Sequence, residues 1–352
     1  MVSPPVRVRA RARLAGGIGL IRIVPDAVPG RKVCKVDARD RGSYRHPMRW
    51  PETIEHLVFR GGVGLLRRMP YPVAEGILRR AAHLAGPVCG LRRGVVDAQL
   101  AAILPHLPAA RRRALRNAVY DHLGRTAAEV FCADPERLAA TVTVAPGWEV
   151  LDAAMAAGRG VIVAAGHLGN FELGGRVLAS RYPLLDVVKP QRNAAFERDL
   201  DALRNRHGIT TVPVDRAGRA VLSHLRRGGM VSLLVDQDAG AAGVRLDFLG
   251  QPASTWPGAA RFALRTGCPV VPVAIVRRRG GHVLQVGEPI AAEPAAAGPD
   301  PVAALMRRIS DGVEAGVLRH PAQWFWVHRR WKGAAEARPP AAGARESAAW
   351  SG

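Results

Sequence analysis

The sequence predicts an α/β protein that is preceded by a basic helical region. From about residue 148 onward, short β-rich runs alternate with segments of helical period. The runs, each of which is an expected strand, cover residues 160–165, 185–188, 230–235 and 269–276. Residues 302–318 place their apolar side chains on one stripe, which predicts a closing amphipathic helix. Alternating strands and helices pack as layers, so we expect an α/β domain over residues 148–335.

Residues 51–147 are expected to be helical. Apolar residues recur there at helical spacing, as in Ile54, Leu57 and Val58, and arginines cluster on the remaining positions. This pattern suits an ordinary amphipathic bundle with a solvated charged face, and it equally suits helices that dock on a membrane. The two interpretations are compatible, and both stay open at this point.

The two ends of the chain differ in composition from the rest. Residues 1–50 carry twelve Arg or Lys against three Asp, with prolines and no sustained periodicity. We therefore expect a basic and poorly ordered extension there. Residues 336–352 are rich in Ala, Pro, Gly and Ser, which predicts a disordered tail.

The charge of the chain points to an anionic partner. The formal net charge is +22, and all but four of the 51 basic residues are arginine. A surplus of this size favours contact with acidic lipid, with an acidic carrier protein or with nucleic acid. Composition does not separate these three partners.

Cysteine and hydropathy patterns narrow the class of protein. The four cysteines are scattered without a C-x-x-C pair, and the histidines do not cluster, so neither a zinc site nor a disulfide framework is expected. No run of 18 apolar residues is free of charge, so no clean transmembrane helix is predicted. The nearest candidates, residues 54–66 and 81–91, are better interpreted as helices that lie in the membrane interface.

The strongest chemical signal is the segment from Gly160 to Glu172, in which a buried strand runs into a Gly-rich turn. His167 lies in this turn and Glu172 follows five residues later, which is about 140° of rotation in a continuous helix. If instead Glu172 lies in the first turn of a new helix, with Asn170 near its cap, the carboxylate can reach back to the imidazole. Such a pair suits a general base that takes a proton from an attacking hydroxyl.

The motif also has explanations that do not involve catalysis. The spacing H-x-x-x-x-E is common by chance, and a histidine after a strand is more often structural than catalytic. A covalent mechanism is disfavoured, because the sequence has no G-x-S-x-G motif and no cysteine placed as a nucleophile. Direct attack by an acceptor hydroxyl is therefore the expected reaction type.

The segment GHLGNFE at residues 166–172 resembles the H-x-x-x-x-D/E motif of the lysophospholipid (glycerolipid) acyltransferase superfamily. It looks most like the late lipid A biosynthesis acyltransferases, which transfer lauroyl or myristoyl chains, and the related phosphatidylinositol mannoside acyltransferases. Further blocks resemble that group in the same order along the chain. They lie at residues 117–129, 204–208, 236–258 and 323–332, and the resemblance covers roughly residues 52–334.

Two departures from the family pattern bear on the substrate. Where many relatives have an aromatic-Arg-Pro sequence, this chain has Val188, Lys189 and Pro190, which keeps a charge but loses the bidentate fork of arginine. The Phe-Pro-Glu-Gly motif of the glycerol-phosphate branch is missing, and Asp236 to Asp238 stand in the corresponding region. A simple lysophosphatidate acceptor is therefore disfavoured.

Roles for the other blocks follow from the resemblance and from their chemistry. Asn170 is expected beside the substrate, and Lys189, Arg192 and Arg204 are expected to hold phosphate or phosphopantetheine oxygens, unless they are a solvated charged face. The remaining substrate-binding candidates, which follow strand ends or begin a helix, are Asp236, Asp238, Thr255 and Gly258. The two aspartates would orient the acceptor sugar or an arginine, or simply cap a turn. Thr255 and Gly258 would place a helix N-terminus at the thioester oxyanion, or cap that helix.

The C-terminal block interleaves cationic and aromatic side chains. Its residues are Trp324, Trp326, His328, Arg329, Arg330 and Trp331. Tryptophan prefers the lipid headgroup layer and arginine prefers lipid phosphate, so an interfacial belt at a membrane or substrate surface is expected. Stacking on nucleic acid and a structural lock onto the sheet are the alternatives.

The resemblance implies a mixed sheet flanked by helices and a membrane-associated acyltransferase. This enzyme would move a fatty acyl chain from an acyl carrier protein or coenzyme A thioester to a hydroxyl of a lipid A precursor or similar glycolipid. A phosphatidylinositol mannoside acyltransferase is one alternative, and a non-catalytic basic binder of membranes or nucleic acid is the other. We expect no metal, no tightly bound cofactor and no nucleic-acid partner. The expected location is the cytoplasmic face of the inner (plasma) membrane, in a peripheral or monotopic manner on anionic lipid.

Overall fold

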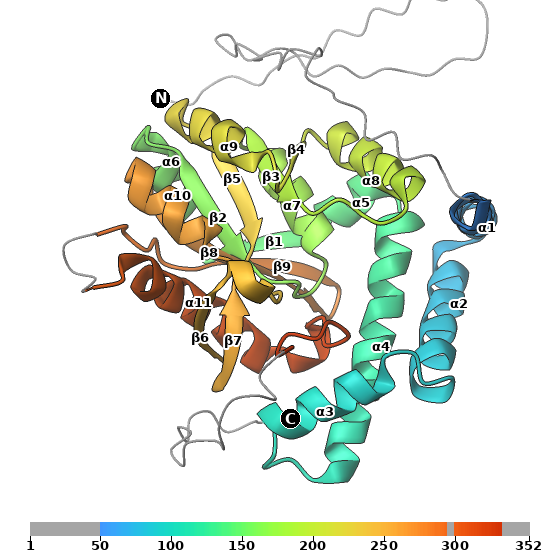
Figure 1. Cartoon of the computed structure of the whole chain (residues 1–352). Coiled ribbons are helices and arrows are strands. Elements are labelled where there is room, and N and C mark those ends of the chain that lie inside the picture. The colour runs from blue at the N-terminus through green and yellow to red at the C-terminus, as the bar shows by residue number, and fades with distance from the viewer. Residues whose placement is uncertain (1–49, 294–298, 333–352) are drawn as a thin grey trace, which may run out of the picture. The chain divides into compact units, whose positions relative to one another are not determined.

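The computed structural model describes residues 50–293 and 299–332 (Figure 1). The expected basic extension, apart from Trp50, and the expected disordered tail at residues 336–352 lie outside the described residues.

A seven-stranded mixed sheet forms the centre of the described part, in the order β1-β9-β8-β2-β5-β3-β4. Its strands are β1 (Val142–Ala145), β2 (Val161–Ala165), β3 (Leu184–Val188), β4 (Thr210–Pro213), β5 (Met230–Leu234), β8 (Val270–Arg278) and β9 (Gly281–Val286). All neighbours pair in parallel except β8 and β9, which pair antiparallel. The α/β class and the mixed sheet expected from the sequence are therefore confirmed.

Helices cover both faces of this sheet, and β2 shows why. Ile162 and Ala164 belong to the core cluster beneath α9 (Ala217–Arg226), α10 (Gly258–Thr266) and α11 (Pro301–Arg319). Val161 and Val163 point the other way, into the cluster beneath α6 (Glu149–Ala156) and α7 (Phe171–Ala179). Alternate residues of a strand face opposite sides, so a wholly apolar strand needs cover on both.

The sequence pattern did not predict several smaller elements. The structure adds α8 (Ala194–Arg206), the short helices η3 (Gly240–Ala242) and η4 (Pro321–Gln323), and an antiparallel hairpin of β6 (Val244–Phe248) and β7 (Gln251–Thr255). Strand β1 begins at Val142, ahead of residue 148, so the sheet takes its edge strand from a segment that we expected to be helical.

Helices dominate the region before β1. They are α1 (Trp50–Leu66), α2 (Tyr71–His83), the π-helical turn η2 (Leu84–Val88), α3 (Arg93–Ile103), α4 (Ala109–Phe131) and α5 (Pro135–Ala140). Helix α2 packs along α4. Among the described residues, no helix combines the length and the apolar content that crossing a membrane requires.

Candidate active site

His167 lies in the turn that follows β2 and precedes α7. Gly169 makes this turn possible, because its φ is +65° and a Cβ atom there would lie 1.7 Å from the carbonyl oxygen of Ile275. The turn is held further by two backbone hydrogen bonds: Gly169 donates to Gln323, and Phe325 donates to the carbonyl of His167. The backbone of the turn is thus fixed against β8 and η4.

The imidazole of His167 pairs with Asp236. Its Nδ1 atom lies 2.7 Å from Oδ1 of Asp236, and the backbone N–H of His167 donates to Oδ2 at 2.6 Å. The parallel register explains the meeting, because Ala165 of β2 lies opposite Leu234 of β5. Two residues beyond this pair, His167 follows β2 and Asp236 follows β5 at the same edge of the sheet. An aspartate 69 positions away in the sequence therefore faces the histidine.

Asp236 is 1% exposed and accepts a third hydrogen bond, from Nε1 of Trp324 at 2.7 Å. Burial alone would raise the pKa of this carboxyl, but the facing imidazole and the three donors lower its pKa below the ordinary value. An ionised carboxylate only accepts hydrogen bonds, so Nδ1 of His167 carries the proton. The lone pair of Nε2 is left for chemistry.

The Nε2 atom of His167 faces the side chain of Gln237. The two nitrogens lie 3.1 Å apart, and the amide of Gln237 donates. Phe171 contacts the ring edge-on with centroids 4.9 Å apart, and Phe325 lies at 6.0 Å. These contacts hold the ring plane while Nε2 points toward the cavity that Gln237 also lines.

The expectation that Glu172 reaches back to His167 is wrong. Glu172 does lie in the first turn of α7, but its carboxylate makes a two-pronged ion pair with Arg204 of α8, with Nε to Oε2 at 3.1 Å. The two ring nitrogens of His167 are taken by Asp236 and Gln237. Glu172 still lines the same cavity as His167, so it remains a wall residue of the site.

The three cations expected to hold phosphate separate into two groups. Arg204 is committed to Glu172, and this pair leaves its side chain 14% exposed, so the sequence-based role does not fit it. Lys189 and Arg192 are exposed and line the cavity. These two are therefore free to meet a substrate anion.

Asn170 does not face the substrate. It is 1% exposed, caps α7 by accepting from the backbone of Leu173, and donates to Glu129 of α4 at 2.9 Å. The expected position near the helix cap is confirmed, but the expected substrate contact is wrong, because both polar atoms are used inside the protein.

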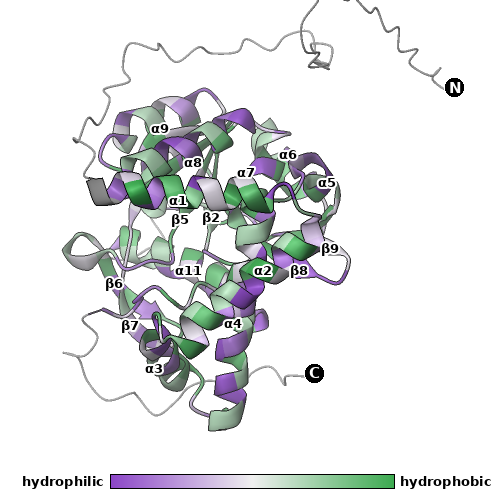
Figure 2. Cartoon of the chain, turned by 90° about the vertical axis from the view of Figure 1, so that its right-hand side faces the viewer, coloured by the Kyte–Doolittle hydropathy of each residue, from purple (hydrophilic) through white to green (hydrophobic). Residues whose placement is uncertain are grey.

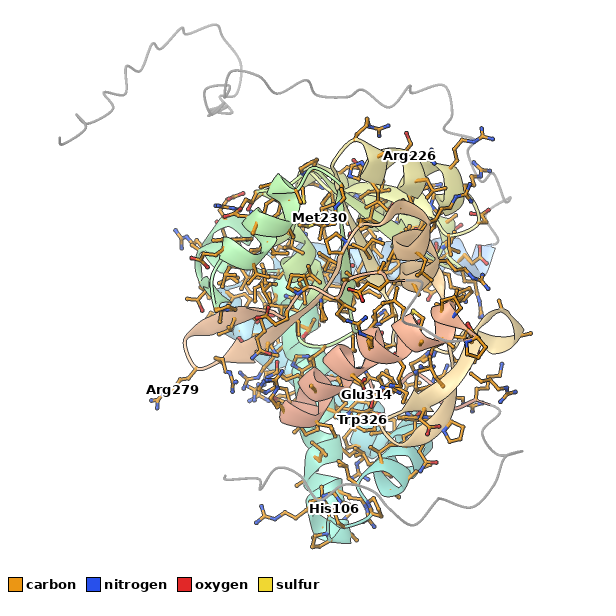
Figure 3. The ribbon with its side chains drawn as sticks, turned by 90° about the vertical axis from the view of Figure 1, so that its left-hand side faces the viewer. His106, Arg226, Met230, Arg279, Glu314 and Trp326 are labelled. Atoms are coloured by element: carbon orange, nitrogen blue, oxygen red, sulfur yellow. The ribbon has the colours of Figure 1, made fainter. Side chains whose placement is uncertain are left out.

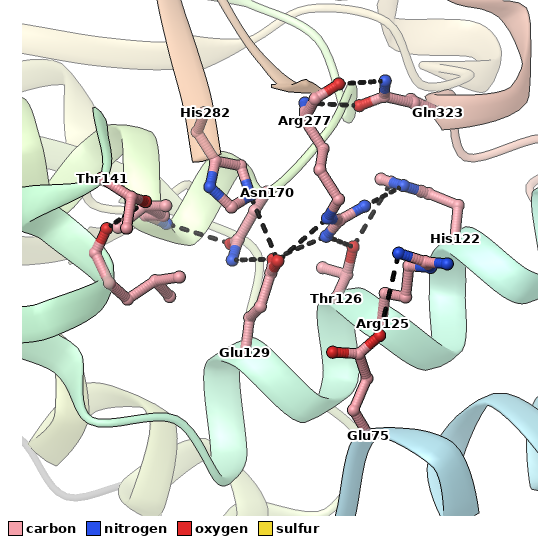
Figure 4. Close-up of polar contacts among 12 residues, drawn as sticks. Glu75, His122, Arg125, Thr126, Glu129, Thr141, Asn170, Arg277, His282 and Gln323 are labelled. Atoms are coloured by element: carbon pink, nitrogen blue, oxygen red, sulfur yellow. Dashed lines mark hydrogen bonds and ion pairs between the residues drawn. The ribbon is translucent and has the colours of Figure 1, made fainter. Parts of the chain in front are cut away.

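Glu129 is the centre of the buried network behind the turn (Figure 4). Besides Asn170 it accepts from Nη2 and Nε of Arg277 at 2.6 and 2.9 Å, and Nε2 of His282 lies 3.2 Å away. Burial would raise the pKa of Glu129, but these partners lower it to about 2. Arg277 also meets Nδ1 of His122, and burial lowers the pKa of that histidine to about 3. The network ties α4, β8 and β9 to the turn that carries His167.

Asp238 and Thr255 lie outside the cavity wall, whereas Gly258 lines it. The backbone of Asp238 donates to Nε2 of His328, and the buried hydroxyl of Thr255 accepts from Arg330. Both residues therefore serve the packing of the C-terminal block, and the substrate role expected for them is not supported. Gly258 begins α10 at the edge of the cavity, as expected.

The C-terminal block is a structural lock and not an interfacial belt. Trp324, Trp326 and Arg330 are 2%, 1% and 0% exposed, and Trp326 lies between α11 and the N-terminal helices (Figure 3). Gln99 of α3 donates to the carbonyls of Trp326 and His328 and accepts from the backbone of Arg330. Trp331 and His328 are half-buried, which leaves Arg329 as the exposed member. Burial overturns the expected contact with membrane or substrate.

The sequence reasoning missed three residues of the site, Gln237, Glu129 and Arg277, and gave a fourth, Trp324, a different role. Gln237 touches Nε2 of His167, Trp324 holds Asp236, and Glu129 and Arg277 fix the turn from behind. Gln237 stood between two aspartates at a strand end, which was a usable signal. The other three lie on elements whose neighbours the sequence does not specify.

A large cavity opens beside Nε2 of His167. Its volume is about 1650 Å³, and it extends over α4, α8, α9 and α10. The apolar side chains that line it include Val130, Phe196, Leu200, Leu222 and Phe262. Such a space suits a long acyl chain beside a base. Within the described ranges, no group of three or more His, Cys, Asp or Glu side chains is arranged to hold a metal ion.

Comparison with known proteins agrees with this geometry. Residues 41–333 match the model of the bacterial lipid A biosynthesis acyltransferases. The chain belongs to this family. It is an enzyme that transfers acyl groups, and the non-catalytic alternative considered from the sequence is set aside.

Characterised relatives fall into two groups by name. A phosphatidylinositol mannoside acyltransferase of Mycobacterium tuberculosis H37Rv is 31% identical over 244 residues, which is 66% of this chain and 75% of that protein. The lipid A biosynthesis palmitoleoyltransferase of Escherichia coli K12 is 26% identical over 280 residues, covering 77% and 90%. The lipid A biosynthesis lauroyltransferase of the same organism is 26% identical over 306 residues, covering 84% and 95%.

Proposed function

We propose that this acyltransferase moves a fatty acyl chain from an acyl carrier protein or coenzyme A thioester to a hydroxyl of a lipid A precursor or similar glycolipid. The observation that carries this proposal is the His167–Asp236 pair, whose imidazole lines a large cavity that apolar and cationic side chains share. A base, a space for an acyl chain and charges for an anionic substrate are the parts that such a transfer needs.

The reaction follows from the protonation state of His167. Nε2 takes the proton of the acceptor hydroxyl as its oxygen attacks the thioester carbonyl carbon, and the carboxylate of Asp236 stabilises the resulting imidazolium. When the tetrahedral intermediate collapses, the carbon–sulfur bond breaks and the departing sulfur receives that proton from Nε2. The thioester supplies the activated acyl group, so the proposed reaction uses no further cofactor.

Charge on the tetrahedral oxygen needs donors close to His167. The first N–H groups of α10, beginning at Gly258, have no acceptor within their own helix and lie at the cavity wall. The amide of Gln237, which in this structure donates to Nε2, is placed to turn toward the reacting atoms when the acceptor hydroxyl takes its position. We assign both to oxyanion or hydroxyl orientation.

A second acceptor is favoured by the similarity values. Identity reaches 31% with a phosphatidylinositol mannoside acyltransferase and 26% with the lipid A enzymes. A mannosylated phosphatidylinositol also offers a sugar hydroxyl beside a phosphate, so the same cavity chemistry would serve it. The lipid A acceptor is supported by the C-terminal block, which is similar to the ending of the lipid A branch.

Membrane association is supported by the outer surface of α1, α2 and η2 (Figure 2). We call this surface the α1–α2 face, and its exposed large apolar residues are Ile54, Leu57, Val58, Leu65, Val73, Ile77, Leu84, Val88 and Leu91. Helix α1 already packs its other side inward, because Phe59 contacts Phe131 and Phe196 with centroids 5.1 Å apart. Apolar groups on both sides of a helix support the proposal that a bilayer covers the outer side.

Arginines flank this apolar face and favour an anionic leaflet. Arg60 lies on α1, Arg80 lies on α2, and Arg67 and Arg68 lie in the turn between these helices, all at exposed positions. We propose docking on the cytoplasmic face of the inner membrane, where acidic lipid would meet these charges.

The experiment that tests the proposed function combines cells and purified protein. Mass spectrometry of glycolipids from cells that lack the gene should reveal a species lighter by one acyl chain, which wild-type protein restores and His167→Ala does not. The purified protein should transfer acyl groups to the same lipid from one of the two thioesters. An unchanged glycolipid profile, together with no transfer to either acceptor class, would refute the proposal.

A further inference from the structure

The wall of the active-site cavity is strongly unbalanced in charge. Its Lys and Arg residues are Lys189, Arg192, Arg204, Arg219, Arg226, Arg227, Arg261 and Arg265, and its single carboxylate is Glu172. That carboxylate is already paired with Arg204. Among the described residues, no second carboxylate lines the cavity. The other seven cations therefore have no carboxylate partner in its wall.

Four of these arginines come from two helices, α9 and α10, and Arg227 directly follows α9. Arg219 and Arg226 are seven residues apart on α9, and Arg261 and Arg265 are four apart on α10, so each pair occupies one face of its helix. The two helices contact each other on the same side of the sheet. Leu222 and Phe262 line the cavity between the charged positions.

We call this region the α9–α10 arm of the cavity, lined by Arg219, Leu222 and Arg226 of α9 and by Arg261, Phe262 and Arg265 of α10. It begins beside the catalytic edge, where both helices start, and follows them toward their C-terminal ends. The separation of seven positions between Arg219 and Arg226 corresponds to about 10 Å at the rise of an α-helix. The outer arginines therefore lie far enough from His167 to hold a group remote from the reacting bond.

The arginines of the arm differ from several other arginines among the described residues. Arg79, Arg116, Arg125, Arg277 and Arg307 each have a carboxylate partner. Arg219, Arg226, Arg261 and Arg265 have no hydrogen bond or ion pair within the described residues, and all four are exposed. Like charges held close together repel, and a bound anion would relieve that repulsion.

We propose that the α9–α10 arm is a binding site for the phosphate group of an amphiphilic substrate, with Arg226 and Arg265 at its outer end. Guanidinium groups bind phosphate oxygens through paired, charge-assisted hydrogen bonds, and the apolar side chains between them fit the slender part of the molecule. This site is separate from Lys189 and Arg192, which lie after β3. The assignment to a substrate rests on the proposed function, because the phosphopantetheine of either thioester donor and the phosphorylated glycolipid both carry this chemistry.

Steady-state kinetics of the double variant Arg226→Ala/Arg265→Ala distinguish the two sources of phosphate. We expect KM to rise about tenfold or more, which is about 1.4 kcal/mol of lost binding, with little change in kcat because the arginines do not touch the reacting atoms. A rise confined to the donor assigns the arm to phosphopantetheine. A rise confined to the acceptor assigns it to the glycolipid phosphate.

The matched control is Arg111→Ala/Arg113→Ala on α4. Both residues are exposed, lie outside the cavity and have no partner in the described part of the chain. This variant therefore removes the same number of positive charges as the arm variant. It should leave both KM values near those of wild type. If the control raises KM as much as the arm variant does, general electrostatics explains the effect and the site is wrong.

Binding of inorganic pyrophosphate gives a readout that does not depend on turnover. Calorimetry should detect binding to wild type and to His167→Ala, and a loss of most of that affinity in Arg226→Ala/Arg265→Ala. Equal pyrophosphate affinity in wild type and the arm variant overturns the site. If binding is lost in the arm variant while wild type transfers no acyl group to any acceptor, the anion site stands and the proposed function fails.

Discussion

The catalytic edge of the sheet, where His167 and Asp236 lie, and the α1–α2 face differ in which kinds of side chain are buried and which are exposed. At the catalytic edge, polar and charged groups are buried, and Asp236, Glu129 and Asn170 each form short hydrogen bonds inside the protein. On the α1–α2 face, apolar side chains such as Leu57 and Val58 are 62% and 70% exposed. Residues of the chain itself satisfy the polar groups of the first region, whereas the exposed apolar side chains of the second are covered only by a partner outside the chain.

This difference separates positioning from recruitment. The partners of His167 come from the segment after β5, from α7 and from the segment after η4, so the geometry of the base exists before any substrate arrives. The α1–α2 face carries no group that touches His167. Changes at the catalytic edge should therefore alter turnover or stability, and changes on the α1–α2 face should alter only binding to lipid.

The largest stability effect is expected at Glu129. Replacing it by glutamine leaves Arg277 buried opposite a neutral amide, and breaking a buried ion pair costs about 3–5 kcal/mol. Thermal unfolding should show a large fall in Tm. The control is Asp152→Asn, which breaks the exposed pair with Arg181 and should lower Tm only slightly, because solvent screens that pair. Equal losses in the two variants would contradict the role given to the buried network.

An intermediate effect that depends on pH is expected at Asp186 of β3. Its Oδ1 atom is buried without a partner, and burial, followed by the nearby charge of Glu172, raises the pKa of this carboxyl to about 7. Between about pH 4 and pH 7 the folded protein keeps a proton that the unfolded chain releases, so rising pH removes stability over this window. Asp186→Asn should lack that loss.

The measurement for Asp186 is the difference in Tm between Asp186→Asn and wild type across pH. This difference should shift in favour of the variant from about pH 4 to pH 7 and then stay level. A difference that does not vary with pH would show that Asp186 ionises normally in the folded protein.

The smallest of these effects is expected on the α1–α2 face. Leu57→Ser/Leu65→Ser should weaken binding to anionic vesicles on the order of tenfold, because less apolar area leaves water. Tm should not fall, since both residues are exposed. Leu318→Ser on α11 is the matched control, an exposed leucine away from this face. Sedimentation with vesicles measures both, and equal binding by the two variants would contradict membrane docking through α1 and α2.

Local pattern predicted much of the fold. The expected strands at residues 160–165 and 230–235 match β2 and β5, and residues 302–318 match α11, because buried strands and amphipathic helices leave clear periodicity. The short edge strand β1 was missed, because four residues of alternating exposure leave a weak signal within a helical region. The glycine-rich turn with His167 was located correctly for the same local reason.

The partner of His167 could not be predicted from local spacing. Glu172 is near in sequence, but Asp236 is brought to the imidazole by the pairing of β2 with β5, and strand order is a property of the whole sheet. The C-terminal block failed in a similar way. Alternating tryptophan and arginine suit a lipid interface, yet Trp326 and Arg330 are buried, and burial depends on what the rest of the chain packs against them.

The most direct test of the account compares kcat of Asp236→Asn with kcat of Glu172→Gln in otherwise identical preparations. Asparagine keeps the size of the side chain but removes the charge that sets the His167 tautomer and stabilises the imidazolium, so kcat should fall roughly 10²–10⁴-fold. Glutamine at 172 disturbs the wall pair with Arg204 and should reduce kcat far less. A severe loss in Glu172→Gln with near-normal turnover in Asp236→Asn would contradict the account.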